Sequence, residues 1–156
     1  MKRAWCVMLL VLVALLPQGC VPLTFSREAP IDFDVYRHVA VQVSVHGLGS
    51  YYDDQSATVY LASELQADSG FDTVSIGDTG SADLILSVSV TLTELVDTSG
   101  DNPDYEYQAD ASFRAVDPSG NEIDSGYVSD SSEHPGEALE DALDEVTLHY
   151  LRPYRL

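Results

Sequence analysis

Strict alternation of apolar and polar residues is the feature that most constrains this sequence. In residues 82–96 the apolar residues Leu84, Leu86, Val88, Val90 and Leu92 fall on one side, and Ile85, Ser87, Ser89, Thr91 and Thr93 fall on the other. Because successive side chains of a strand point to opposite faces, this pattern predicts a long strand with one buried and one solvated face. The same period predicts strands over residues 38–45, 105–116 and 122–129, and a short strand is expected over residues 71–76.

Two segments have the helical period instead. Residues 54–67 bring Tyr60, Leu61 and Leu65 to one side, with Asp54 or Ser56 as the expected N-cap and Gly70 just beyond the end. Pro135 opens a second helix, in which Ala138, Leu139, Ala142, Leu143 and Val146 share a face. The predicted order is strand, helix, four strands, helix. This order predicts an α+β fold: a two-layer sandwich with a mostly antiparallel five-stranded sheet and two helices on one face.

The N-terminal residues predict an export signal. Lys2 and Arg3 precede an apolar run over residues 4–16, which is too short to span a bilayer comfortably. Gly19 and Cys20 resemble the end of the bacterial lipoprotein box, although Pro17 stands where that box has a leucine. We therefore expect a lipoprotein-type signal peptide (residues 1–19), a lipidated Cys20 with a short tether (20–31) and a single domain (32–156). The alternative is a secreted soluble protein with one free thiol.

The residue that follows Cys20 helps to predict which membrane holds the protein. Val21 follows Cys20, where an aspartate would favour retention at the inner membrane by analogy with sorting in enteric bacteria. We therefore expect a protein anchored in the outer membrane that faces the periplasm or the cell surface.

Charge excludes one class of partner. The chain has 26 Asp and Glu residues against 7 Lys and Arg residues, and its formal net charge is −19. Nucleic acids and anionic lipid headgroups are bound mainly through basic residues that neutralise phosphates. We therefore expect no nucleic-acid partner, and a membrane contact that depends on the lipid anchor.

Two short stretches resemble a family of small bacterial envelope lipoproteins that carry a domain of unknown function. The first is Asp32, Phe33 and Tyr36 before the first strand, and the second is Ala82, Asp83 and Leu84 before the third. The order of elements is also similar to the amino-terminal domain of TolB and to the curli-export lipoprotein. The resemblance covers about residues 31–150. It implies an envelope lipoprotein of non-enzymatic type, and no catalytic residues or cofactor come with it.

An acidic loop is the candidate metal site. Asp97, Asp101, Asn102 and Asp104 offer hard oxygen ligands of the kind that calcium prefers. The EF-hand spacing is absent, and carboxylates cluster by chance in so acidic a chain. The sequence therefore leaves two interpretations of this loop open: a calcium site, or a solvated loop that binds no ligand.

A catalytic site has less support. Gly47 and Gly49 precede Ser50, and Asp53 and Asp54 follow, but glycines between a strand and a helix are more often turn geometry. His38, His46, His134 and His149 are scattered and match no metalloprotease motif.

The solvated face of the sheet is the remaining candidate, as a partner surface. Its expected residues are Gln42, Ser44, Ser87, Ser89, Thr91, Gln108, Asp110, Ser112 and Arg114. The leading hypothesis is a non-enzymatic, lipid-anchored envelope protein with a binding or scaffolding role, whose partner is another envelope protein. The alternatives are an exported soluble module that binds calcium or another ligand, and an envelope hydrolase.

Overall fold

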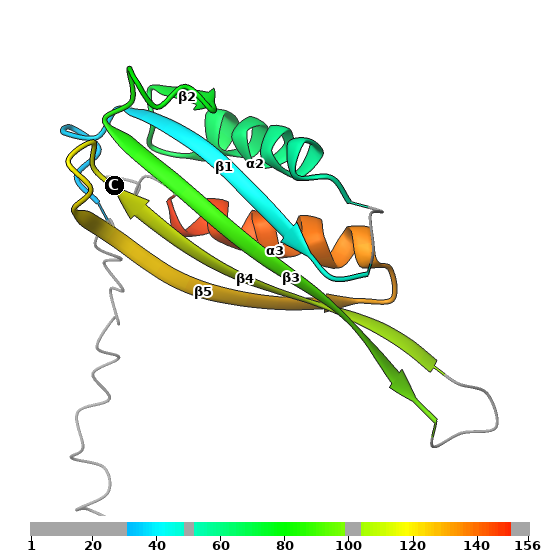
Figure 1. The fold of residues 1–156 in the computed structure, drawn as a ribbon. Helices are drawn as coiled ribbons and strands as arrows, with labels where there is room; N and C mark the ends of the chain where they lie inside the picture. Colours follow the sequence, from blue (N-terminus) through cyan, green and yellow to red (C-terminus); the bar gives the residue numbers. More distant parts are fainter. Residues whose placement is uncertain (1–30, 49–51, 99–103, 151–156) are drawn as a thin grey trace, which may run out of the picture.

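The alternating segments form one five-stranded sheet in the computed structural model, which describes residues 31–48, 52–98 and 104–150 (Figure 1). The elements in chain order are β1 (His38–His46), α2 (Asp54–Asp68), β2 (Thr73–Ile76), β3 (Leu84–Asp97), β4 (Asp104–Val116), β5 (Glu122–Ser132) and α3 (Pro135–His149). The predicted fold class, α+β with this order of elements, is confirmed.

Neighbouring strands follow the order β2-β1-β3-β4-β5. The two long ladders, β3 with β4 and β4 with β5, are antiparallel, as the alternation predicts. β1 pairs in parallel with both β2 and β3. A parallel neighbour needs a crossover connection, and α2 provides it between β1 and β2.

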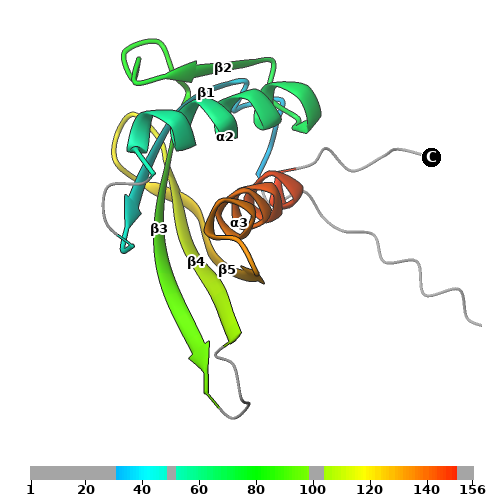
Figure 2. The ribbon, with the colours of Figure 1, turned by 90° about the vertical axis from the view of Figure 1, so that its right-hand side faces the viewer.

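The core lies between the sheet and the helices, which cover the same side of the sheet (Figures 1 and 2). The side predicted to be apolar is the buried one. Its members at 5% exposure or less include Val39, Val41, Val43, Leu84, Leu86, Val88, Val90, Leu92, Ala109, Ala111 and Phe113. α2 contributes Leu61 and Leu65, and α3 contributes Leu143 and Val146, all at 1% exposure or less. The apolar residues expected to face the core therefore do so in β3 and α3, whereas Tyr60 of α2 is only partly buried.

The start of α2 differs from the expectation. Asp53, rather than Asp54 or Ser56, is the N-cap, and its carboxylate accepts hydrogen bonds from the Ser56 backbone N–H at 2.7 Å and from the Ser56 hydroxyl at 2.9 Å. These bonds lower the pKa of Asp53 below its usual range. Asp53 and Asp54 are equally suitable N-cap residues by residue type. Asp54 is used elsewhere, because its carboxylate accepts the Val45 backbone N–H at 2.8 Å.

Gly47 allows the chain to turn sharply after β1. Its φ is +91°, and a Cβ at this position would lie 2.1 Å from the Leu92 carbonyl oxygen. Both the positive φ and this close approach require glycine. The glycine that was weighed as part of a catalytic loop is therefore explained by turn geometry.

The hairpin of β3 and β4 projects beyond the helices (Figures 1 and 2). β1 ends opposite Thr91, and β5 ends opposite Tyr107, whereas β3 and β4 stay paired as far as Asp97 and Asp104. We call residues 94–97 and 104–107 the arm. Leu95, Val96 and Tyr105 on it are 41–48% exposed.

No helix among the described residues is long and apolar enough to cross a membrane. The predicted signal peptide, Cys20 and most of the tether lie outside the described residues, so their roles remain predictions.

Candidate partner surface

The face of the sheet opposite the helices carries polar side chains in regular rows. The register places Gln42, Ser87, Arg114 and Ser125 in one row across four strands, and Ser44, Ser89, Ser112 and Tyr127 in the next. A third row consists of His46, Thr91, Asp110 and Ser129, and Thr93, Gln108 and Ser131 form a fourth. The structure therefore brings together all the residues that the sequence proposed as a partner surface. We call these four rows the open face.

Asp110 is the centre of a hydrogen-bond network on the open face. Its Oδ1 atom accepts hydrogen bonds from the Tyr127 hydroxyl, from the Ser129 hydroxyl at 2.8 Å and from the Gln108 side-chain amide at 3.0 Å. The bond from Tyr127, followed by that from Ser129, holds the pKa of the Asp110 carboxyl below its usual range. The same bond raises the pKa of Tyr127. This carboxylate therefore stays charged and fixed in place.

Further side-chain bonds join neighbouring strands along the open face. The Gln42 amide donates to the Ser87 hydroxyl at 2.6 Å, which links β1 to β3. Arg114 of β4 donates through Nε to Glu122 of β5 at 2.7 Å. Charge-assisted bonds of this kind are short and directional. These residues are thus pre-ordered before any partner arrives, which lowers the entropic cost of binding.

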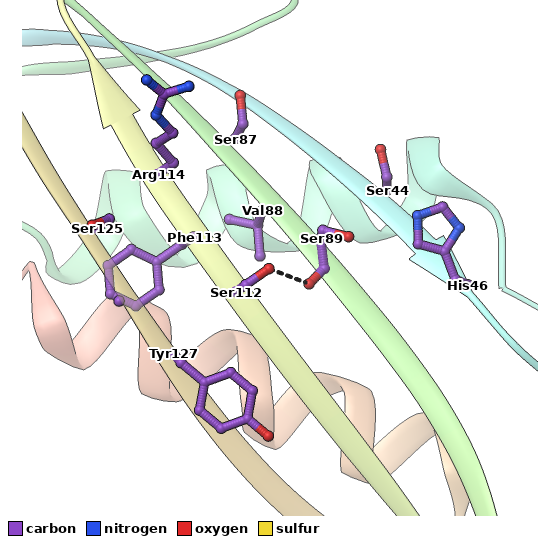
Figure 3. Close-up of a pocket in the computed structure, with 11 residues that line it drawn as sticks. Ser44, His46, Ser87, Val88, Ser89, Ser112, Phe113, Arg114, Ser125 and Tyr127 are labelled. Carbon is purple, nitrogen blue, oxygen red and sulfur yellow. Dashed lines mark hydrogen bonds between the residues drawn. The ribbon is translucent and has the colours of Figure 1, made fainter. Parts of the chain in front are cut away.

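A shallow hollow of about 690 Å³ lies on this face (Figure 3). Its polar lining includes Ser44, His46, Ser89, Ser112, Arg114 and Tyr127. Figure 3 shows these side chains on adjacent strands, with the Ser112 hydroxyl directed toward the Ser89 carbonyl, to which it donates at 3.5 Å. The surface offers many hydroxyl groups, one guanidinium and one exposed aromatic ring, so it suits polar contact with a broad partner.

Tyr127 is the most exposed aromatic side chain on the open face, at 63%, and the sequence analysis missed it. The cause is a β-bulge between Ala115 and Val116. In a regular hairpin that pairs Val116 with Glu122, Tyr127 would lie opposite Ala111, on the buried face. The bulge shifts the register by one residue, places Tyr127 opposite Ser112 and reverses the faces of β5.

The candidate calcium ligands are only partly described. Asp97 and Asp104 are register partners at the end of the arm, while Asp101 and Asn102 lie outside the described residues. Within residues 31–48, 52–98 and 104–150, no group of three His, Cys, Asp or Glu side chains is arranged to hold a metal ion. The calcium site remains a prediction.

The residues of the hydrolase hypothesis have structural partners. Asp53 caps α2, and Asp54 accepts from β1, as described above. Ser50 lies outside the described residues. The structure thus gives both carboxylates a role that involves no reaction.

Two histidines are part of the framework. His149 Nε2 lies 2.8 Å from Asp124 Oδ2, which joins the end of α3 to β5, and the His149 ring packs on Phe113 at 4.8 Å between centroids. His38 Nδ1 lies 3.3 Å from Asp83 Oδ2. His46 lies on the open face, and His134 is the N-cap residue of α3. The four histidines therefore occupy four separate places.

The two motifs behind the family resemblance have structural roles. The Asp32 carbonyl accepts the backbone N–H groups of Val35 and Tyr36, which makes the turn before β1. Phe33 is buried and meets Phe71 edge-on at 5.3 Å. Asp83 ties the start of β3 to the start of β1. Both motifs thus fix the same end of the sheet and lie outside the open face.

Comparison with families and with curated proteins finds no match for this chain. Solved structures match its fold. A PelC dodecamer from Paraburkholderia phytofirmans has a TM-score of 0.57 at 21% identity, covering 75% of this chain and 90% of that one. A point variant of PelC from the same organism, also a dodecamer, has a TM-score of 0.58 at 18% identity, with coverage of 80% and 95%.

A minor lipoprotein from Acinetobacter baumannii matches with a TM-score of 0.50 at 14% identity, covering 73% of this chain and 88% of that one. At these identities the likeness concerns the fold. The similarity to the TolB amino-terminal domain remains a prediction. The chain therefore has a fold similar to that of PelC and of this minor lipoprotein.

Proposed function

We propose that this protein is a non-enzymatic lipoprotein of the bacterial outer membrane that acts as a scaffold, anchored through Cys20 and assembled from several copies. The observation that carries the proposal is the open face, a sheet surface with an ordered network of side chains that no described helix covers, while the helices occupy the other face of the sheet. The carboxylate at the centre of the open face, Asp110, already accepts three hydrogen bonds from side chains of the same face. A binding role needs no rearrangement of this surface, because its side chains are already held by hydrogen bonds.

The anchor follows from the leader sequence. A basic pair, an apolar run and Gly19-Cys20 favour lipidation, and Val21 favours the outer membrane. The similar fold of a minor lipoprotein supports this assignment. Assembly from several copies is supported by the two PelC structures of similar fold, each of which is a dodecamer.

The partner surface is tested by photo-crosslinking in intact cells. A photo-reactive amino acid replaces Ser112 on the open face, and in a matched strain it replaces the exposed Glu140 on the far side of α3. We expect a discrete envelope-protein adduct from position 112 and none from position 140. Equal labelling from both positions, or no adduct from position 112, would contradict a partner role for the open face.

The anchor is tested by fractionation of a Cys20→Ser variant. We expect the wild-type protein in the outer-membrane fraction and the variant absent from that fraction, because the variant lacks the thiol that would carry the lipid. A variant that stays in the outer-membrane fraction would contradict anchoring through Cys20.

A further inference from the structure

The arm lacks the support that the rest of the sheet has. Beyond Tyr107 the described residues form two strands only, and no described helix lies behind them (Figure 2). An isolated two-stranded hairpin is marginally stable in water. Leu92 and Ala109, which are register partners closer to the core, are 3% and 0% exposed, whereas Val96 and Tyr105 are 48% and 47% exposed. Val96 and Tyr105 therefore stand on the same side as the buried rows of β3 and β4, beyond Glu94 and beyond the part of the sheet that the described helices cover.

The two faces of the arm differ. Val96, Tyr105 and Tyr107 continue the row of buried residues, together with Glu94. Leu95 continues the open face, which here also carries Asp97, Asp104 and Glu106. These acids would be repelled by anionic lipids. Exposed apolar side chains set among acids suit contact with a protein surface that offers both apolar and polar groups.

Tyrosines gather where the arm leaves the core. The Tyr107 hydroxyl donates to Glu94 across the hairpin at 3.2 Å. Tyr107 and Tyr52 are both partly buried and pack against the core. Tyr105 follows two residues further out. Tyrosine is enriched in protein interfaces, where its ring is covered and its hydroxyl still finds a partner.

The size of the arm indicates the kind of partner. Three exposed apolar side chains bury far less than the roughly 1,200 Å² of a stable pairwise interface. Contacts between two different surfaces of the same protein can close into a ring. Each copy in the ring then takes part in two contacts, one with each neighbour, so a small contact area can hold the assembly together. The occupant that supplies such a repeated contact is another copy of the same chain.

We infer that the arm is the element through which neighbouring copies of this protein contact one another, by insertion of Leu95, Val96 and Tyr105 against the next copy. The inference rests on the assembly in the proposed function and names its contact. It leaves the open face available for a different partner.

The test compares the mass distributions of full-length proteins extracted from membranes in detergent, over a range of concentrations. The arm variant combines Leu95→Thr, Val96→Thr and Tyr105→Thr, since threonine keeps the strand propensity and removes the apolar surface. The matched control combines Val35→Thr and Ile76→Thr, which are 59% and 50% exposed and lie away from the arm. A photo-reactive residue at position 96 of the otherwise native chain gives a second measurement that does not depend on the stability of the triple variant.

We expect the wild type and the control to form the same closed oligomer, and the arm variant to need at least roughly tenfold higher concentration to form it. We also expect position 96 to cross-link one copy to another. An arm variant that assembles like the wild type, or a position 96 that gives no adduct between copies, would overturn the inference while leaving assembly in place. A wild type that is monomeric at every concentration would overturn both.

Discussion

Asp83 and His38 join the starts of β3 and β1 by hydrogen bonds in both directions. The Asp83 backbone N–H donates to the His38 carbonyl at 2.8 Å, and the Asp83 carboxylate accepts the His38 backbone N–H at 3.1 Å. The same carboxylate oxygen accepts the Arg37 N–H at 3.2 Å. The alanine-aspartate-leucine motif of the sequence is thus a clamp between two parallel strands.

Replacement of Asp83 by alanine should leave the backbone N–H groups of Arg37 and His38, at the start of β1, without this acceptor. We expect a loss of about 1–2 kcal/mol in the free energy of unfolding, measured by urea denaturation. Asp83→Asn keeps an oxygen acceptor and should lose less. Glu145→Ala, an exposed acid on α3, serves as the control for the change in charge. Equal effects of Asp83→Ala and Glu145→Ala would contradict the clamp.

Gly126 lies under the ring of Phe113, and a Cβ at position 126 would be 2.3 Å from the Cζ atom of that ring. Gly126→Ala should therefore displace a buried aromatic side chain and cost about 1–3 kcal/mol of stability. Gly80→Ala is the matched control, because its Cβ would meet only an ordinary contact at 3.5 Å. Thermal unfolding of both variants checks the prediction. A Gly126→Ala melting temperature equal to that of Gly80→Ala would show that the ring is not held there.

The network on the open face makes a prediction about pH. Its hydrogen bonds lower the pKa of Asp110 from the ordinary value of 3.8, and the bond from Tyr127 has the largest effect. The stabilisation is therefore fully present above that value and is lost as the pH falls through the lower folded pKa. Tyr127→Phe should raise the pKa of Asp110 more than Ser129→Ala does. Carbon-detected NMR titration measures both shifts, and the reverse order would be inconsistent with the geometry.

The contact between His149 and Asp124 should couple α3 to β5 energetically. Both side chains are largely shielded, at 29% and 15% exposure, and their atoms lie 2.8 Å apart. We expect His149→Ala and Asp124→Ala each to cost about 1–3 kcal/mol. The double variant should be more stable than the sum of the two losses predicts, by about 1 kcal/mol. Strictly additive losses in the denaturation series would mean that the two groups act independently.

Most of the fold follows from periodicity. The alternation of Leu84 through Leu92 fixes which face of β3 is buried, and the helical spacing of Leu139, Leu143 and Val146 does the same for α3. Pairing in parallel around β1 was not predicted, because alternation specifies faces and says little about which strands are neighbours. The choice of Asp53 as the cap depends on a contact between Asp54 and β1, which is not local in the sequence.

The open face was predictable for β1, β3 and β4, where each polar residue alternates with a buried one. It was not predictable for β5, because a single bulge reverses its faces and brings Tyr127 to the surface. The arm also could not be seen in the sequence. Tyr105 continues the apolar row of β4 without a break, whereas Glu94 interrupts the row of β3 before Val96, and only the lengths of β1 and β5 show where the cover ends.

Intact mass spectrometry of the membrane-extracted mature protein determines whether Cys20 carries a lipid anchor. We expect a chain that begins at Cys20 and carries the added mass of a diacylglycerol group. An unmodified N-terminus, cut at another position, would contradict the anchor and make the protein a soluble exported domain.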